Sequence, residues 1–294
     1  MKIESSDYPK IFVDADDMSN KAQRIYKGLN KAVLFILFVA TIMVSIDDHI
    51  VSEFKYWHLS TGVLFLVASL LLVCLFYIKP ERKWYLGRAV AESIKSISWK
   101  FMMSAEPFDA DDNKNNEALF IKRLNEIYKK ANENGALLKS ISGNTEPISR
   151  VLKHVRSLTY IEKKSIYLEN RLQEQIEWYS GSATTNKNRA NILLFGVISL
   201  QVVTAGYLIF FSNSFHFSNI PEITIFIVTA ILALIEMNKY RELKESYLYT
   251  ANELIYIRNR VSIINSDLEL NEFVSDAELA ISREHTMWLA RREN

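Results

Sequence analysis

The sequence has few of the residues that build disulfide frameworks or loop-rich folds. Its 294 residues include a single cysteine, Cys74, so one chain forms no internal disulfide and no cysteine-based metal site. Only 8 glycines and 5 prolines are present, which argues against a β-rich or loop-rich chain. The formal net charge is +1, so the chain lacks the basic excess that predicts nucleic acid as a partner.

Motifs for catalysis or cofactor binding are also missing. The sequence contains no glycine-rich phosphate loop, no HExxH motif and no Ser/His/Asp order typical of hydrolases. The five histidines are scattered, and the one acidic–histidine cluster, Asp47–Asp48–His49, offers too few ligands for a metal. The acidic N-terminus has no early apolar core, so we expect no secretory signal peptide. We therefore expect a protein that is not an enzyme and binds no cofactor.

Apolar residues are instead concentrated in four runs, which are Ala32–Ile46, Trp57–Ile78, Ile192–Phe211 and Ile223–Ile235. The second and third are about 20 residues long and uncharged, which matches the thickness of a bilayer at about 1.5 Å per helical residue. The first and fourth are shorter, and alone each would also suit a buried core helix or a re-entrant segment. Because each lies close to a full-length run, we predict four membrane spans, the fourth within about 220–237.

Basic residues predict how these spans are oriented. Lysines and arginines lie before the first run, after the second, before the third and after the fourth. The connection 47–56 carries only Lys55 beside three acids, and the connection 212–222 carries no lysine or arginine. By the positive-inside rule, both termini and the middle segment are expected on the cytoplasmic side. The prediction is a multi-pass protein in contact with a lipid bilayer.

Outside the spans, apolar residues at spacings of three and four predict long helices. We expect them over 80–104, 117–131, 148–190 (continuing into the third span), 239–264 and 269–292. Residues 132–147, with two glycines and a proline, read as a linker between a first module, 1–131, and a second, 148–294. The predicted fold is an all-α membrane protein with four transmembrane helices, arranged as two helical hairpins, and long cytoplasmic helices.

The two modules resemble each other. In the first, QRIYK precedes the apolar runs and RAVAESIK follows them; in the second, QIEWY precedes them and TANELIYI follows. This order places Glu92 and Glu253 at corresponding positions.

Longer stretches carry a resemblance to a known family. YLENRLQEQIEWYSGSATTNKNRA, TANELIYI and FVSDAELAISREHTMWLARR resemble the SLATT domain, a two-transmembrane effector domain associated with SMODS nucleotidyltransferases and SLOG nucleotide-sensing domains. YPKIFVDADDMSNKAQRIY and RAVAESIKSISWKFMMSAEPF resemble a second SLATT subtype. The resemblance implies a membrane effector of bacterial anti-phage conflict, located in the inner membrane. It also implies a pore that forms when a nucleotide signal or partner triggers it. Because four spans are too few to enclose a wide aqueous pore, we expect a homo-oligomer.

The chain contains no sensor-like βαβ pattern, so a separate protein is expected to carry the trigger. Arg171, Gln175, Trp178 and Tyr179 lie within about two turns of one predicted helix. They are candidates for a face that couples a trigger to the third span, and ordinary helix packing is the alternative.

Glu92 and Glu253 are candidates for buried ion pairs with Arg88, Arg171 or Arg258. The alternative is that both carboxylates lie on exposed helix faces, where ion pairs contribute little.

Polar residues within the third span are candidates for a conducting path. Gln201 lies near the middle of the run, with Ser199 and Thr204 close by. Polar groups at bilayer depth usually face protein or a water-filled path. Lining of a pore and hydrogen bonding between helices are both open for these three residues. At the level of the whole protein, a pore-forming effector and a non-conducting membrane scaffold are both consistent with the sequence.

Overall fold

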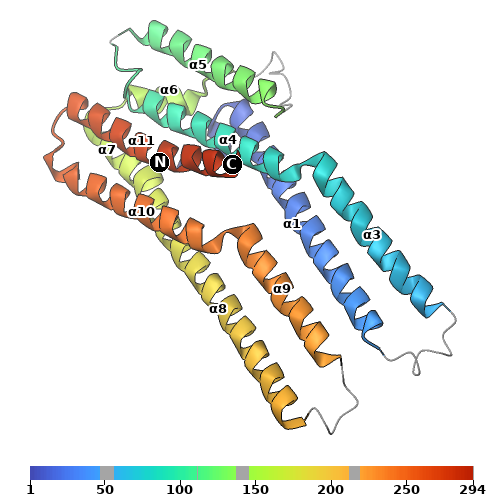
Figure 1. The fold of residues 1–294 in the computed structure, drawn as a ribbon. Coiled ribbons are helices and arrows are strands. Elements are labelled where there is room, and N and C mark those ends of the chain that lie inside the picture. The colour runs from blue at the N-terminus through green and yellow to red at the C-terminus, as the bar shows by residue number, and fades with distance from the viewer. Residues whose placement is uncertain (47–55, 111, 137–145, 212–218, 294) are drawn as a thin grey trace. The chain divides into compact units, whose positions relative to one another are not determined.

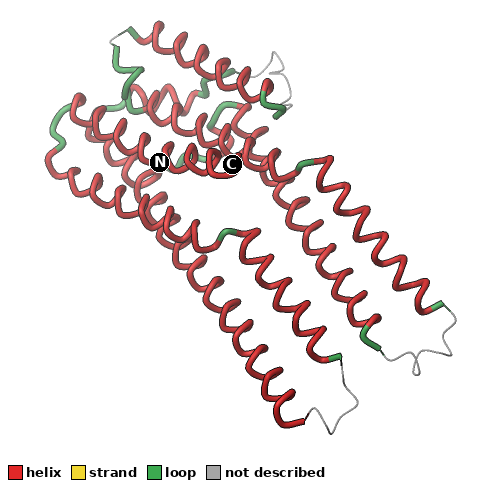
Figure 2. Tube along the Cα trace, viewed as in Figure 1, coloured by secondary structure: helices red, strands yellow, loops and turns green. Residues whose placement is uncertain are grey.

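The computed structural model describes residues 1–46, 56–110, 112–136, 146–211 and 219–293, with the backbone alone for 211 and 284–293. Over these residues the chain is all-α (Figure 2). The predicted fold class is therefore confirmed as an all-helical protein. The cluster Asp47–Asp48–His49 and most of the expected linker, 137–145, lie outside the described residues.

The helices follow one another with short connections (Figure 1). The elements in chain order are the 3-10 turn η1 (Ser5–Asp7), α1 (Lys10–Val44), α3 (Trp57–Ile78), α4 (Pro80–Met102), α5 (Asn113–Glu133), α6 (Arg150–Ser157), α7 (Tyr160–Tyr167), the π-helical turn η2 (Leu168–Leu172), α8 (Gln173–Phe211), α9 (Ile220–Asn238), α10 (Tyr240–Asn259), the 3-10 turn η3 (Arg260–Ile263) and α11 (Asp267–Glu293).

Four helical stretches are long and apolar enough to cross a membrane. They are Lys10–Val44, Trp57–Met102, Tyr160–Phe210 and Ile220–Ile263, and each contains all or nearly all of one predicted apolar run. Few residues in the apolar window of each are fully buried in the folded chain. An exposed apolar surface of this extent suits lipid as its solvent, because water would penalise it at every side chain.

The chain divides into two compact units, and neither is continuous in sequence. Unit 1 comprises Met1–Gln23, Glu81–Ala183 and Glu245–Asn294. Unit 2 comprises Arg24–Pro80 and Thr184–Lys244, and therefore contains the four apolar runs. Helices α1, α4, α8 and α10 each contribute residues to both units.

Within unit 2, hydrogen bonds join the apolar helices. The Trp57 indole N–H at the start of α3 donates to the Met43 carbonyl near the end of α1, at 3.1 Å. The hydroxyls of Thr204 in α8 and Thr224 in α9 lie 2.8 Å apart. Asn219, just before α9, donates to the carbonyl of Ser45, which follows α1. All four helices of the unit are therefore connected by contacts outside their own backbone ladders.

Helix starts are fixed by side-chain caps. The Ser149 hydroxyl accepts from the Leu152 N–H at the start of α6, and Thr159 forms a capping box with Glu162 at the start of α7. Because Thr159 adopts an extended backbone conformation, the helix is interrupted between Ser157 and Tyr160. The prediction of one unbroken helix over 148–190 is wrong at this point. The continuation into the third span is confirmed, since α8 runs from Gln173 to Phe211.

The core of unit 1 forms around the C-terminal end of α4. Trp99 and Phe101 are fully buried there, and the Phe101 ring contacts that of Phe120 in α5 at 4.8 Å. The Arg156 guanidinium of α6 donates to the carbonyls of Phe101 and Phe108, at 2.6 and 2.8 Å. A cation at the C-terminal end of a helix satisfies carbonyls that have no partner within that helix. Burial lowers the pKa of Arg156, with Glu117 acting in the opposite sense.

Both apolar helices that lead back to unit 1 end in the same way. Lys79 ends α3 and Lys239 ends α9, and each has a left-handed backbone, with φ of 45° and 48°. A new helix, α4 or α10, starts directly after each lysine. Glycine is the usual residue at such positions, so the two lysines do not by themselves mark where α3 and α9 end.

Candidate functional site

A buried ionic cluster lies in the core of unit 1. Arg171, in the π-helical turn, and Glu278, in α11, are both fully buried. The guanidinium Nε and Nη2 of Arg171 donate to the two carboxylate oxygens of Glu278, both at 2.8 Å. The Tyr167 hydroxyl, also buried, donates to Glu278 Oε1 at 3.1 Å. Both carboxylate oxygens of Glu278 are thus hydrogen-bonded, as a buried charge requires.

A second carboxylate approaches the same guanidinium from α4. Glu92 Oε2 lies 4.0 Å from Arg171 Nη1, and its side chain is a quarter exposed. The cluster thus joins α4, the π-helical turn and α11 through one cation and two carboxylates. The predicted partnership of Glu92 with Arg171 is present in the structure, alongside a stronger one with Glu278.

The pKa values of the cluster follow from its burial and charges. Burial alone would lower the pKa of Arg171, but the charge and hydrogen bonds of Glu278 outweigh it and raise that pKa. Burial raises the pKa of Tyr167 well above its ordinary value, and the negative charge of Glu278 raises it further. Arg171 therefore remains a cation and Tyr167 remains a neutral donor throughout the physiological range.

An aromatic group follows on the next turns of α8. Tyr179 is fully buried, and Trp178 is 41% exposed. Their rings lie 4.9 Å apart, and that of Tyr247 in α10 lies 5.2 Å from Trp178. The Arg88 guanidinium of α4 lies 5.2 Å from the Trp178 ring, in a cation–π arrangement. Gln175, one turn before Tyr179, is buried.

The four coupling candidates therefore all lie in unit 1, against elements from both halves of the sequence. Arg171, Gln175 and Tyr179 are buried in the interior of unit 1. Trp178 is partly exposed at its surface, with the Arg88 guanidinium over the ring. The π-helical turn that precedes α8 adds one residue to a turn, a feature that is frequent at functional positions in helices.

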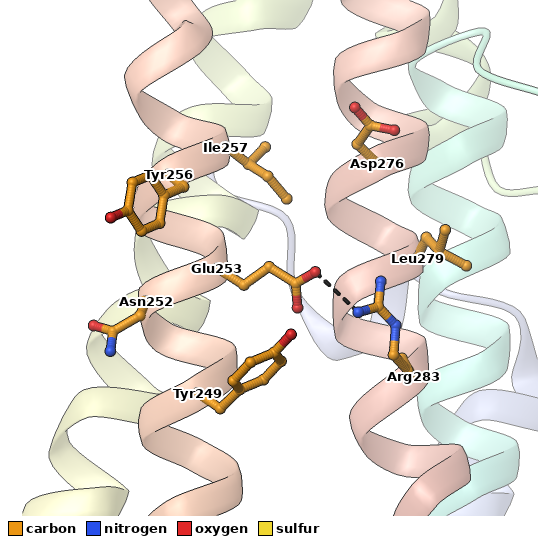
Figure 3. A pocket seen from close by; sticks show the side chains of 8 residues that line it. All are labelled: Tyr249, Asn252, Glu253, Tyr256, Ile257, Asp276, Leu279 and Arg283. Atoms are coloured by element: carbon orange, nitrogen blue, oxygen red, sulfur yellow. Dashed lines mark hydrogen bonds and ion pairs between the residues drawn. The ribbon is translucent and has the colours of Figure 1, made fainter.

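Glu253 lies apart from this cluster, in a cavity between α10 and α11 (Figure 3). Its carboxylate reaches across to α11 and accepts a hydrogen bond from Arg283 Nη1 at 3.0 Å. The cavity has a volume of about 460 Å³. The predicted partners Arg88, Arg171 and Arg258 are not those of Glu253; Arg258 instead donates to Gln173 in α8, at 2.9 Å.

The three polar candidates of the third span differ in their surroundings. Thr204 is buried, and its hydroxyl is bonded to that of Thr224. Ser199 is half-buried, and Gln201 is exposed. Among the described residues, no hydrogen bond involves the Gln201 side-chain amide. One of the three therefore joins two helices of the same chain, and Gln201 points away from them.

Glu278 is the central residue that sequence reasoning missed. It belongs to a stripe of buried positions on α11 formed with Leu270, Val274 and Ile281. An acid at a spacing of three and four within an apolar stripe is a signal of burial. Ala277–Glu278 also repeats the Ala91–Glu92 pair of the first module. Within the described residues, no group of three or more His, Cys, Asp or Glu side chains is placed to hold a metal ion.

Comparison with protein families gives two adjoining matches. Residues 9–164 match SMODS and SLOG-associating 2TM effector domain 3, and residues 167–288 match SMODS and SLOG-associating 2TM effector domain 1. The second match begins at Tyr167, so it contains both Arg171 and Glu278. No curated protein and no solved structure matches the chain.

Proposed function

Because the chain belongs to the SLATT family of two-transmembrane effector domains associated with conflict systems, we propose that it is a non-enzymatic pore-forming effector of bacterial anti-phage defence. In this proposal several copies assemble in the inner membrane and open a conducting path when a signal arrives. The signal comes from a separate sensor protein or a nucleotide that such a protein makes.

The exposed amide of Gln201 carries the proposal. Its exposed neighbours on α8 include Ile198, Val202 and Val203, which are all apolar. Transfer of an amide from water to a hydrocarbon costs roughly 4–8 kcal/mol when nothing hydrogen-bonds to it. A helix that faced only lipid at this position would therefore gain from an apolar residue. Contact with the same amide of another copy, or with water in a shared path, removes the penalty.

The number of spans also supports assembly. Four apolar helices per chain are too few to enclose a wide aqueous channel, so a path for ions requires several copies. Thr204 does not contribute a polar group to such a path in this arrangement, because its hydroxyl is already bonded to Thr224. Gln201 and the half-buried Ser199 are the candidates that remain for the lining.

The composition of unit 1 supports a topology with both termini on one side of the membrane. The N-terminal segment, the segment between the second and third runs, and the C-terminal segment all belong to this unit. Basic residues flank the spans at these segments, so the positive-inside rule favours a cytoplasmic location for unit 1.

The test is to induce the full chain in a bacterial host and to follow the membrane potential with a voltage-sensitive dye before viability falls. Triggering requires co-expression of the neighbouring genes if the chain alone is silent. We expect loss of potential with the native chain and its reduction by Gln201→Leu. Val203→Leu, which exchanges one exposed apolar residue for another two positions away, is the matched control and should conduct like the native chain.

Two results would contradict the proposal. If Gln201→Leu conducts as well as Val203→Leu at equal membrane expression, Gln201 does not line the path. If the potential is unchanged with every neighbouring gene present while the cells still stop growing, the chain acts as a non-conducting scaffold.

A further inference from the structure

The contacts within unit 2 fix which ends of its apolar helices lie together. The Trp57 indole bonds to the Met43 carbonyl, so α3 starts where α1 ends. The ring of Phe38, near the end of α1, lies 6.1 Å from that of Phe226, near the start of α9. The threonine pair described above joins the later part of α8 to the start of α9. The segments before the apolar runs of α1 and α8, and after those of α3 and α9, therefore lie at the same end of the unit.

This end of unit 2 is strongly basic. Among the described residues of the unit, its only carboxylates are those of Glu236 and Glu242, whereas the opposite end has Glu222 and no lysine or arginine. Six basic side chains that form no ion pair within the described residues are Lys31, Lys79, Lys187, Arg189, Arg241 and Lys244. We call these residues, together with Lys239, the basic end of unit 2. Its charge is complementary to an anionic ligand.

Two of these lysines stand at strained positions. Lys79 and Lys239 end α3 and α9 with left-handed backbones, where glycine would fit without strain. Lys79 lies 5.9 Å from the Phe76 ring, and Lys239 lies 3.6 Å from the exposed carboxylate of Glu242. The positive-inside rule accounts for basic residues near spans but not for lysine where glycine is favoured. A strained residue that recurs at the same place in two hairpins points to a function of its side chain.

Exposed apolar side chains adjoin both lysines. On α3, Phe76 and Ile78 are exposed just before Lys79. On α9, Leu232 is exposed about two turns before Lys239. A phosphate group that carries acyl chains would contact the basic side chains and this apolar surface together. Inorganic phosphate would contact the basic side chains alone, so the combination favours a lipid as the ligand.

We propose that the basic end of unit 2 binds the headgroups of anionic phospholipids, with Lys79 and Lys239 as its principal phosphate ligands. Each ammonium donates to headgroup phosphate oxygens, and the acyl chains lie along the exposed apolar side chains of α3 and α9. Binding of this kind offsets the strain of a left-handed lysine, because glycine at the same position would offer no charge. The inference does not depend on whether the spans conduct.

The test measures which lipid the full chain retains at its surface in vesicles of phosphatidylcholine. Trace amounts of spin-labelled phosphatidylglycerol or spin-labelled phosphatidylcholine are the probes, and electron paramagnetic resonance gives the fraction of each that the protein immobilises. We expect a preference for phosphatidylglycerol of at least about threefold, since one basic residue near an anionic headgroup contributes about fivefold. The preference should weaken as salt screens the charges.

Substitutions locate the site. Lys79→Gln/Lys239→Gln should lower the preference at least about twofold, because it removes both charges and keeps side chains of similar length. Lys129→Gln/Lys130→Gln removes the same charge from two exposed positions on α5 of unit 1 and is the matched control. It should retain the native preference.

A glycine variant separates lipid binding from folding. Lys79→Gly/Lys239→Gly relieves the backbone strain, so it should melt no lower than the native chain in phosphatidylcholine. It should nevertheless lose the preference for phosphatidylglycerol to the same extent as the glutamine variant. A purely structural role of the lysines would lower the melting temperature instead.

Three outcomes would overturn the proposal. The first is equal immobilisation of the two spin-labelled lipids by the native chain. The second is a preference in Lys79→Gln/Lys239→Gln that equals that of the α5 control. The third is displacement of phosphatidylglycerol by inorganic phosphate beyond the effect of chloride at equal ionic strength, because free phosphate would then be the ligand. The membrane potential plays no part in these readouts, so failure of this inference is distinguishable from failure of the proposed function.

Discussion

Replacement of Arg171 by methionine should destabilise unit 1 strongly, because it leaves a buried carboxylate without its cation. Glu278 accepts two hydrogen bonds from the Arg171 guanidinium, both at 2.8 Å, and both side chains are fully buried. Glu92 would lose the same partner. Removal of one member of a buried ion pair costs about 3–5 kcal/mol. For a unit of this size, each kcal/mol lowers the melting temperature by about 2–4 °C, so we expect a decrease of roughly 6–20 °C.

The assay is thermal unfolding of the full chain in detergent, followed by intrinsic tryptophan fluorescence, to which Trp99 and Trp178 of unit 1 contribute. The double variant Arg171→Met/Glu278→Met should recover most of the loss, since replacing a whole buried pair by apolar residues is often neutral. Arg123→Met, which breaks an exposed pair on α5, is the control and should cost less than about 1 kcal/mol.

The reasoning would be refuted if Arg171→Met melted within about 2 °C of the native chain, which corresponds to less than about 1 kcal/mol. It would also be refuted if the double variant were less stable than Arg171→Met alone. In that case the guanidinium would act through packing on its aliphatic stem, and the charge of Glu278 would be irrelevant to the cost.

Three further predictions concern packing and backbone geometry. Gly87→Ala should lower the free energy of unfolding by about 1–3 kcal/mol, because the added Cβ would lie 2.9 Å from a backbone oxygen of α1. Gly181→Ala, with open space around it, should raise that free energy by about 0.5–1 kcal/mol. Thermal unfolding measures both, and similar effects at the two positions would contradict this contrast. Thr204→Val should cost about 0.6 kcal/mol in unfolding by a denaturing detergent, and a double-mutant cycle with Thr224→Val should return that value as the coupling energy. Lys239→Gly should stabilise by about 0.5–1 kcal/mol, since glycine relieves the left-handed backbone, and a loss of stability would show that the lysine side chain outweighs its strain.

The sequence predicted the helices well because their signals are local. The apolar runs and the spacing of three and four along α4, α5, α8 and α10 each depend on neighbouring residues alone. Local signals also located the turn before α11. They did not locate the break before Tyr160, because the preference of Thr159 for a capping box competes with a continuous apolar pattern on both sides of it.

The candidate site was only partly predictable, because it is assembled from distant segments. Arg171 was identified as a candidate, yet its main partner lies 107 positions further along the chain. Arg171 pairs with Glu278 and not with Glu253 because of the side of α10 and of α11 that packs into the core of unit 1. No local sequence pattern determines which side that is. Glu253 shares its sequence context with Glu92, but in the folded chain it lines the cavity between α10 and α11 and pairs with Arg283.

The exposed position of Gln201 was also not predictable from the sequence. Hydropathy places it near the middle of a span but does not tell which side of α8 packs on α9. Thr204 lies three residues later and would be expected on the same face, yet it is buried against Thr224 and Gln201 is not. The boundary between packed and outward-facing sides of α8 runs between these two residues.

The presence of two pairs of long apolar helices in one chain restricts the stoichiometry of any assembly of whole chains. A closed ring of n chains contains 2n pairs, so the total is always even, and half of the pairs are α1 with α3. Such a ring has n-fold symmetry and contributes one Gln201 for every two pairs. Each chain contributes four apolar helices but one Gln201. An estimate that assigns one such amide to every apolar helix would therefore be four times too high.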